Sequence, residues 1–83
     1  MQKLKPDLDI GKNIQDLRIK NGLTQEEVAA KMQVLGCDIS RVIYARMENC
    51  TYNIRISELC ALKIIFKAEF DDFFKGLVPE DFR

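Results

Sequence analysis

The stretch LTQEEVAAKM, residues 23–32, constrains the fold more than any other part of the chain. Thr24 is a favourable N-cap, and Glu27 three residues later can return a hydrogen bond, so that the two form a capping box. Leu23 before the cap and Val28 inside the helix are placed for a hydrophobic staple. The stretch therefore predicts a helix with a sharply defined start.

The same helix is predicted to run further than its start requires. Met32 and Leu35 continue the apolar stripe up to Gly36, which is a plausible C-terminal stop. We expect the helix to be extended by about one turn, followed by a widened connection at residues 37–39. A stop near Lys31 would instead change the angle at which the next helix is presented.

Four further helices and no convincing strand are expected along the chain. Asp9 can cap the first of them, and the helix that follows the widened connection begins near Ser40. The connections between the segments are short, which favours an all-α bundle in one domain, residues 1–83, with a core over about 9–76. The four further helices are expected over about residues 9–21, 40–49, 55–66 and 70–76.

The composition excludes several classes of protein. A hydrophobic share of 47% with 31% charged residues is that of a globular chain. The longest apolar stretch is far shorter than the ~20 residues of a membrane span, and the N-terminus lacks the apolar core of a secretory signal. We therefore expect a cytoplasmic protein with no membrane partner. The absence of histidine, of a nucleophile motif and of a phosphate loop argues against an enzyme.

The three cysteines are Cys37, Cys50 and Cys60. Their odd number and the absence of a CxxC pair argue against a disulfide framework. A zinc site without histidine would have to be built from thiolates and carboxylates. We expect no metal, no cofactor and no small-molecule ligand.

The charge is balanced overall but unevenly distributed. The net charge is zero; up to Arg55 there are nine basic and seven acidic residues, and after it four basic and six acidic ones. The chain thus divides into a part of about +2 and a part of about −2. A compact basic face is compatible with this distribution, although charge alone does not demonstrate one.

The helix expected over 40–49 has two distinct faces. Ile43, Tyr44 and Met47 recur at the spacing of a buried stripe. An exposed valine between arginines is unusual on a surface that has no partner. The opposite, outward face consists of Arg41, Val42, Ala45 and Arg46.

The order of these segments resembles the helix-turn-helix domains of phage repressors and Cro proteins, the XRE family. The resemblance rests on LTQEEVAAKM, then SRVIYARMEN, then ELCALKIIFKAEFDDFF, and covers about residues 10–75. Each segment alone is a weak signal, but their order and spacing together are fairly specific. The resemblance implies a five-helix lambda-repressor-like bundle with an extended second helix and turn.

The resemblance also implies how such a chain reads double-stranded DNA. In the family the third helix lies in the major groove. Matching backwards from Glu48, the base-reading positions are Arg41, Val42 and Arg46. Arginine can bind O6 and N7 of guanine, and valine can pack on a thymine methyl group. The alternative is an ordinary solvated arginine face.

Contacts to the DNA backbone follow from the same match. A glutamine just inside the second helix is typical of the family, and Gln25 occupies that place. Simple turn chemistry is the alternative for the loop after the third helix. The implied backbone-contacting residues are Gln25, Asn49, Thr51, Tyr52 and Asn53.

Arg18 and Glu48 match an arginine and a glutamate that pair in relatives. We expect a partly buried ion pair that orients the third helix against the first. Three departures from the family pattern stand out. The interval from Thr24 to Glu48 is about five residues longer. Cys50 and Lys67 occupy positions where relatives often have glycine, so that Lys67 is expected in a left-handed conformation.

The C-terminal third is rich in phenylalanine, and an uncovered aromatic patch usually marks a partner surface. Phe70, Phe73 and Phe74 are the expected interface of a homodimer on a palindromic operator. The alternative is that every phenylalanine fills the core of one protomer. The expected function is that of a sequence-specific transcriptional regulator, and of a repressor in particular. Its rival is a protein-interaction module or antitoxin with the same fold.

Overall fold

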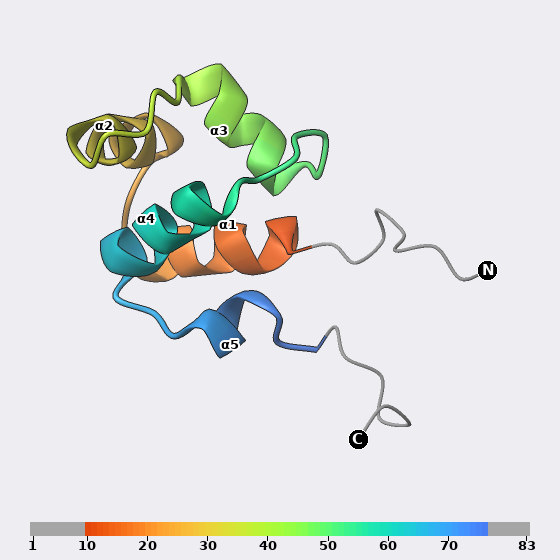
Figure 1. Cartoon of the computed structure of the whole chain (residues 1–83). Helices are drawn as coiled ribbons and strands as arrows, with labels where there is room; N and C mark the ends of the chain where they lie inside the picture. The colour runs from red at the N-terminus through yellow and green to blue at the C-terminus, as the bar shows by residue number, and fades with distance from the viewer. Residues whose placement is uncertain (1–9, 77–83) are drawn as a thin grey trace.

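The structure, a computed structural model, describes residues 10–76 of the chain. Over these residues it contains five helices and no strand (Figure 1). The expected all-α fold of five helices is thereby confirmed. The helices are α1 (Gly11–Lys20), α2 (Gln25–Val34), α3 (Arg41–Glu48), α4 (Ile56–Phe66) and α5 (Phe70–Phe73).

Helix α2 is extended, as predicted. It ends at Val34, and Gly36 follows with a φ of +92°. Met32 is fully buried and continues the apolar stripe, but Leu35 is 44% exposed, so its predicted place in that stripe is wrong. The reason is that Leu35 is the C-cap of the helix, where the chain already turns away from the helical path.

The two outer helices differ from the prediction at their ends. Helix α1 begins at Gly11 with Ile10 as its N-cap, and the proposed cap Asp9 lies outside the described residues. Helix α5 is one turn shorter than expected. The Phe74 amide bonds to the Asp71 carbonyl at 3.1 Å, a tightened i to i−3 bond that ends the helix. The tail after Gly76, including Phe82, also lies outside the described residues.

The helices form a small bundle in which α2 contacts α3 and α4, while α1 contacts α3 and α5 (Figure 1). Asn13 fixes α5 to α1, because its side-chain amide donates to the carbonyls of Phe73 at 2.8 Å and Lys75 at 3.1 Å. The largest fully buried side chains come from all five helices: Ile14, Val28, Met32, Tyr44, Met47, Leu62 and Phe73.

Four helices end in the same left-handed turn. In each, the residue after the positive-φ position bonds back to a carbonyl five residues earlier, as Thr51 does to Arg46 at 3.0 Å. The left-handed residue of α4 is Lys67, with a φ of +53°, which confirms the predicted conformation. The positive-φ residues of these four turns are Gly22, Gly36, Cys50 and Lys67.

Candidate nucleic-acid interface

Helix α3 presents one polar-apolar-polar face to solvent. Successive residues of an α-helix are rotated by about 100°, which places residues 41, 42, 45 and 46 within one sector of ~140°. Arg41 and Arg46 are exposed, and Val42 between them is 54% exposed. The buried side chains of Tyr44 and Met47 lie on the opposite side and fix which face points outward.

The start of α3 is set by its N-cap. The Ser40 hydroxyl oxygen accepts a hydrogen bond from the Ile43 amide at 3.2 Å, as expected for a serine in this position. The helix therefore begins at Arg41, so that this arginine lies in its first turn beside the unpaired amides of the helix terminus.

The connection between α2 and α3 is anchored in the core. Ile39 is buried, and its carbonyl accepts a hydrogen bond from the Gln33 side chain of α2 at 2.8 Å. The Ile39 amide in turn bonds to the Cys37 carbonyl at 2.8 Å. The longer connection is thus pinned at two points, which sets the direction in which α3 leaves it. An isolated isoleucine between Asp38 and Ser40 was the sequence signal for this anchor.

Arg18 and Glu48 form a buried ion pair that joins α1 to the end of α3. Arg18 Nε donates to Glu48 Oε2 at 2.7 Å, and Nη2 to Oε1 at 3.4 Å. Arg18 Nη1 also donates to the Leu23 carbonyl at 3.0 Å. The side chain of Glu48 is 3% exposed and that of Arg18 14%. The guanidinium of Arg18 is thus engaged within the protomer by the Glu48 carboxylate and the Leu23 carbonyl.

Gln25 belongs to the same cluster. Its side-chain amide donates to Glu48 Oε1 at 3.0 Å, which ties the first turn of α2 to the last turn of α3. Burial by itself raises the pKa of Glu48, but the hydrogen bonds from Arg18 and Gln25 and the charge of Arg18 outweigh it. The pKa of Glu48 therefore lies below its ordinary value of 4.5.

The Tyr44 hydroxyl lies beside this cluster in the core. Burial raises its pKa, and the nearby Glu48 carboxylate raises it further, so the phenol stays neutral. Among the described residues it has no hydrogen-bond partner of ordinary geometry.

The residues after α3 divide into two groups. Asn49, Thr51 and Asn53 are exposed at the end of α3 and in the loop that follows. Tyr52 is half-buried, and its hydroxyl donates to Glu58 Oε2 at 2.8 Å; Glu58 also accepts from the Arg55 amide at 2.9 Å. The Tyr52 hydroxyl is thus engaged in holding the loop to α4.

Gly11 is a residue that the sequence-based analysis missed. It is buried at the start of α1, directly against the last turn of α3. A Cβ atom there would lie 2.8 Å from the Met47 carbonyl oxygen and closer still to that of Glu48. Only glycine permits this approach of the two helices. A glycine at the start of a predicted helix was the available signal, but nothing in the sequence identified its neighbour.

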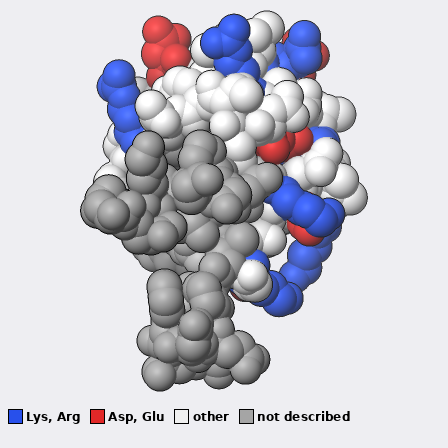
Figure 2. All heavy atoms as spheres, turned by 90° about the vertical axis from the view of Figure 1, so that its right-hand side faces the viewer, with Lys and Arg blue, Asp and Glu red and all other residues white. Residues whose placement is uncertain are grey.

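Basic and acidic side chains adjoin on the face that carries the loop after α3. Figure 2 shows basic side chains at the top and along the lower right edge of this face, with acidic groups between some of them.

The fold and this surface define a DNA-binding helix-turn-helix domain: α2 and α3 in fixed relation, with α3 exposing a face of arginines and an apolar side chain. Residues 14–73 match the model of a family described as helix-turn-helix, and the chain belongs to this family, whose members are the XRE-type DNA-binding regulators. No curated protein and no solved structure matched the chain. The family is one of regulatory domains, not of enzymes.

No helix within residues 10–76 has the length and apolar character needed to cross a membrane. Nor do three or more potential metal-ligating side chains cluster there.

Proposed function

We propose that this regulator is a repressor that recognises a specific operator sequence with α3 in the major groove and binds it as a homodimer. The observation that carries the proposal is the exposed face of α3, where Val42 lies between Arg41 and Arg46. A bound domain of this size covers its DNA site and keeps other proteins from it, which is the simplest route to repression.

The proposed readout follows from the chemistry of the three side chains. Arg41 and Arg46 each bind the O6 and N7 atoms of a guanine, with about 1–3 kcal/mol of discrimination per pair. Val42 packs on the methyl group of a thymine. The half-buried Ala45 between them leaves room for the base edges to approach the helix.

Contacts to the DNA backbone fix the register of α3 in the groove. The first turn of α2, at Gln25, offers unpaired amides and the positive end of the helix dipole to a phosphate. Asn49, Thr51 and Asn53 supply further donors from the exposed end of α3 and its loop. We leave Tyr52 out of this set, because its hydroxyl proton is already donated to Glu58.

The homodimer would place two copies of α3 one turn of DNA apart, about 34 Å, on a palindromic site. Phe70 and Phe74 are exposed and support an interface that includes α5. Phe73 is removed from the expected interface: it is fully buried and its ring lies 6.5 Å from that of Phe66 inside the protomer.

The test is an unbiased selection of bound DNA from a random pool, followed by binding measurements by fluorescence anisotropy. We expect a palindromic consensus that contains guanine and thymine in each half-site. The double variant Arg41→Ala, Arg46→Ala should lose all preference for the consensus over unrelated DNA. Lys12→Ala removes a charge from exposed α1 and should keep that preference.

Two outcomes would contradict the proposal. Enrichment of no sequence, with weak binding that is the same for every DNA, would favour the rival protein-interaction module. An unchanged preference in the double arginine variant would show that α3 is not the reading helix.

A further inference from the structure

Within residues 10–76, two apolar surfaces have no covering element among the described residues and lie outside the α3 face. The first is a hollow of about 380 Å³ between the ends of α2 and α4, which we name the lysine-rimmed pocket. Its apolar lining includes Val34 and Ile64, which are 85% and 63% exposed, together with Leu35. The charged residues that line it are Lys31 and Lys67.

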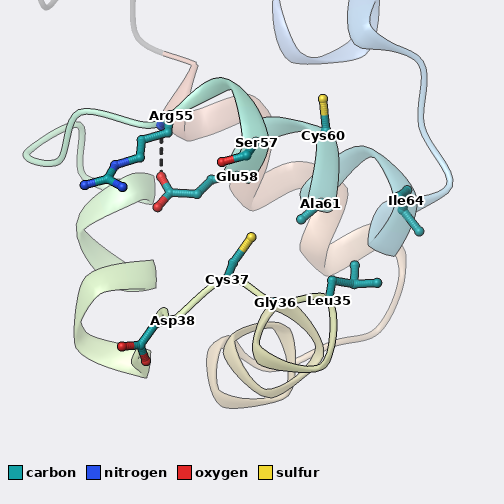
Figure 3. Close-up of a pocket in the computed structure, with 10 residues that line it drawn as sticks. All are labelled: Leu35, Gly36, Cys37, Asp38, Arg55, Ser57, Glu58, Cys60, Ala61 and Ile64. Atoms are coloured by element: carbon teal, nitrogen blue, oxygen red, sulfur yellow. Dashed lines mark hydrogen bonds between the residues drawn. The ribbon is translucent and has the colours of Figure 1, made fainter.

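Leu35 and Ile64 also connect this pocket to a neighbouring hollow of about 470 Å³. Figure 3 shows these two side chains together at one end of that hollow, with Asp38 and Arg55 at its other end. The apolar end of the groove is thus the end that carries the lysine rim. A partner here meets aliphatic side chains flanked by positive charge.

The second surface is the outer side of α5, which we name the acidic α5 face. Phe70 and Phe74 are 42% and 43% exposed. Glu69 and Asp71 are exposed beside them. Two lysines also lie here, Lys63 over the Phe70 ring and the exposed Lys75. The complement of the lysine-rimmed pocket is therefore the pair of carboxylates on Glu69 and Asp71 beside the aromatic side chains.

Size argues against a dimer built from α5 alone. A phenylalanine side chain offers roughly 150–250 Å² in total, so two rings exposed by less than half supply only about 150–200 Å² per protomer. A stable interface buries about 800 Å² from each partner. The interface must therefore draw on a second apolar surface, and the lysine-rimmed pocket collects three of the exposed large apolar side chains.

The two surfaces meet at the last turns of α4. The Lys63 ammonium lies 5.4 Å from the centre of the Phe70 ring, and the next residue, Ile64, lines the pocket. When two surfaces adjoin in this way, a two-fold axis that passes between them can place each surface of one copy against the other surface of the second copy. Each contact then occurs twice, and the interface closes without leaving either surface free.

We propose that the lysine-rimmed pocket of one protomer receives the acidic α5 face of a second copy of the chain, and that the two copies exchange this contact reciprocally. The proposal rests on the homodimer proposed above and specifies its contacts. Phe70 and Phe74 pack on Val34, Leu35 and Ile64 of the other copy, and Asp71 lies by Lys31.

The experiment is sedimentation equilibrium of the full chain, with circular dichroism to confirm that each variant is folded. Val34→Glu places a charge in the pocket and should raise the dimer dissociation constant at least ~10-fold. Ile56→Glu is the matched control, since Ile56 is 78% exposed at the opposite end of α4, and should leave the constant unchanged. Because both side chains are largely exposed, neither change should unfold the protomer.

A charge exchange tests which surfaces meet. Lys31→Glu and Asp71→Lys should each weaken the dimer, and the double variant should recover most of the wild-type affinity. Failure of the double variant to recover would overturn the proposed pairing. A dimer that is lost in Phe74→Glu but kept in Val34→Glu would show that α5 contacts itself, and would likewise overturn it.

Failure of this proposal is distinguishable from failure of the proposed function. A monomer at all concentrations that still binds a selected half-site through Arg41 and Arg46 would overturn the exchange and the homodimer while leaving the readout by α3 intact. An intact exchanged dimer without selective DNA binding would overturn the readout alone.

Discussion

At the scale of single residues, Glu48 is the junction of the DNA-binding half of the fold. Its carboxylate accepts hydrogen bonds from Arg18 on α1 and from Gln25 on α2, while its own helix carries the reading face. A group in this position transmits any displacement of α1 or α2 to α3. Gln25 accordingly has two tasks in our account, since the helix start that faces a phosphate is also the one tied to Glu48.

The low pKa of Glu48 links folding to pH. Since its folded-state pKa lies below its unfolded value, the stabilisation is complete above about pH 4.5 and is lost as the pH falls through the folded pKa. In urea titrations from pH 7 to pH 3, the free energy of unfolding of the wild type should fall more steeply than that of Glu48→Gln. Asp16→Asn, which removes an exposed carboxylate, should keep the wild-type slope. Parallel curves for wild type and Glu48→Gln would contradict this role.

At the scale of elements, two of the helices end in a left-handed residue that is less favourable there than glycine. Glycine occupies the left-handed position after α1 and α2, but cysteine and lysine occupy it after α3 and α4. An L-residue there is strained by roughly 1–2 kcal/mol, and the carbonyl bonds of the turn are formed in spite of it.

Lys67→Gly should stabilise the protein. The relief of left-handed strain exceeds the extra backbone entropy of glycine in the unfolded chain, about 0.5–1 kcal/mol, which leaves a net gain of about 0.5–1 kcal/mol. Lys67 is exposed, so little packing is lost. Thermal unfolding would measure the gain, and Gly22→Ala, the reverse change in the equivalent turn of α1, should lower the melting temperature. A less stable Lys67→Gly variant would count against strain at this position.

The packing of α1 on α3 gives the next prediction. Gly11→Ala should destabilise the fold by about 1–3 kcal/mol, because the added methyl group meets the backbone carbonyls of Met47 and Glu48 rather than a movable side chain. The shift of the end of α3 should also weaken DNA binding beyond what lost stability explains. Gln15→Ala, on the exposed side of α1, is the control for both measurements. Wild-type stability in Gly11→Ala would show that the two helices separate at no cost.

At the scale of the whole molecule, the sequence predicted what local rules determine. The capping box at Thr24 and the two faces of α3 depend on neighbours within a few residues, whereas the left-handed Lys67 was implied by the resemblance to relatives with glycine there. Among contacts between segments, the Arg18–Glu48 pair was implied by the resemblance and is present, but others escaped prediction. The approach of Gly11 to α3, the burial of Phe73 rather than Phe74, and the bond from Tyr52 to Glu58 each depend on where another helix lies. A helix of one turn such as α5 is too short for the spacing of its apolar residues to show which of them are buried.

The dependence of DNA affinity on salt concentration tests how many DNA phosphates the basic groups of the whole molecule neutralise. Because the chain is neutral overall, we expect few phosphates to be neutralised and hence a shallow slope. Each neutralised phosphate adds about −0.9 to the slope of log affinity against log salt concentration. If Arg41 and Arg46 contact bases, replacing either by alanine reduces discrimination by about 1–3 kcal/mol and leaves this slope nearly unchanged.

The measurement is a titration of consensus and single-base-changed DNA at several salt concentrations, with Lys20→Ala on α1 as the control for simple loss of charge. Loss of discrimination at one base pair, with an unchanged slope, would assign each arginine to a base. A slope reduced by about one unit, with equal weakening on every DNA, would instead assign that arginine to a phosphate and remove it from the reading residues on this face.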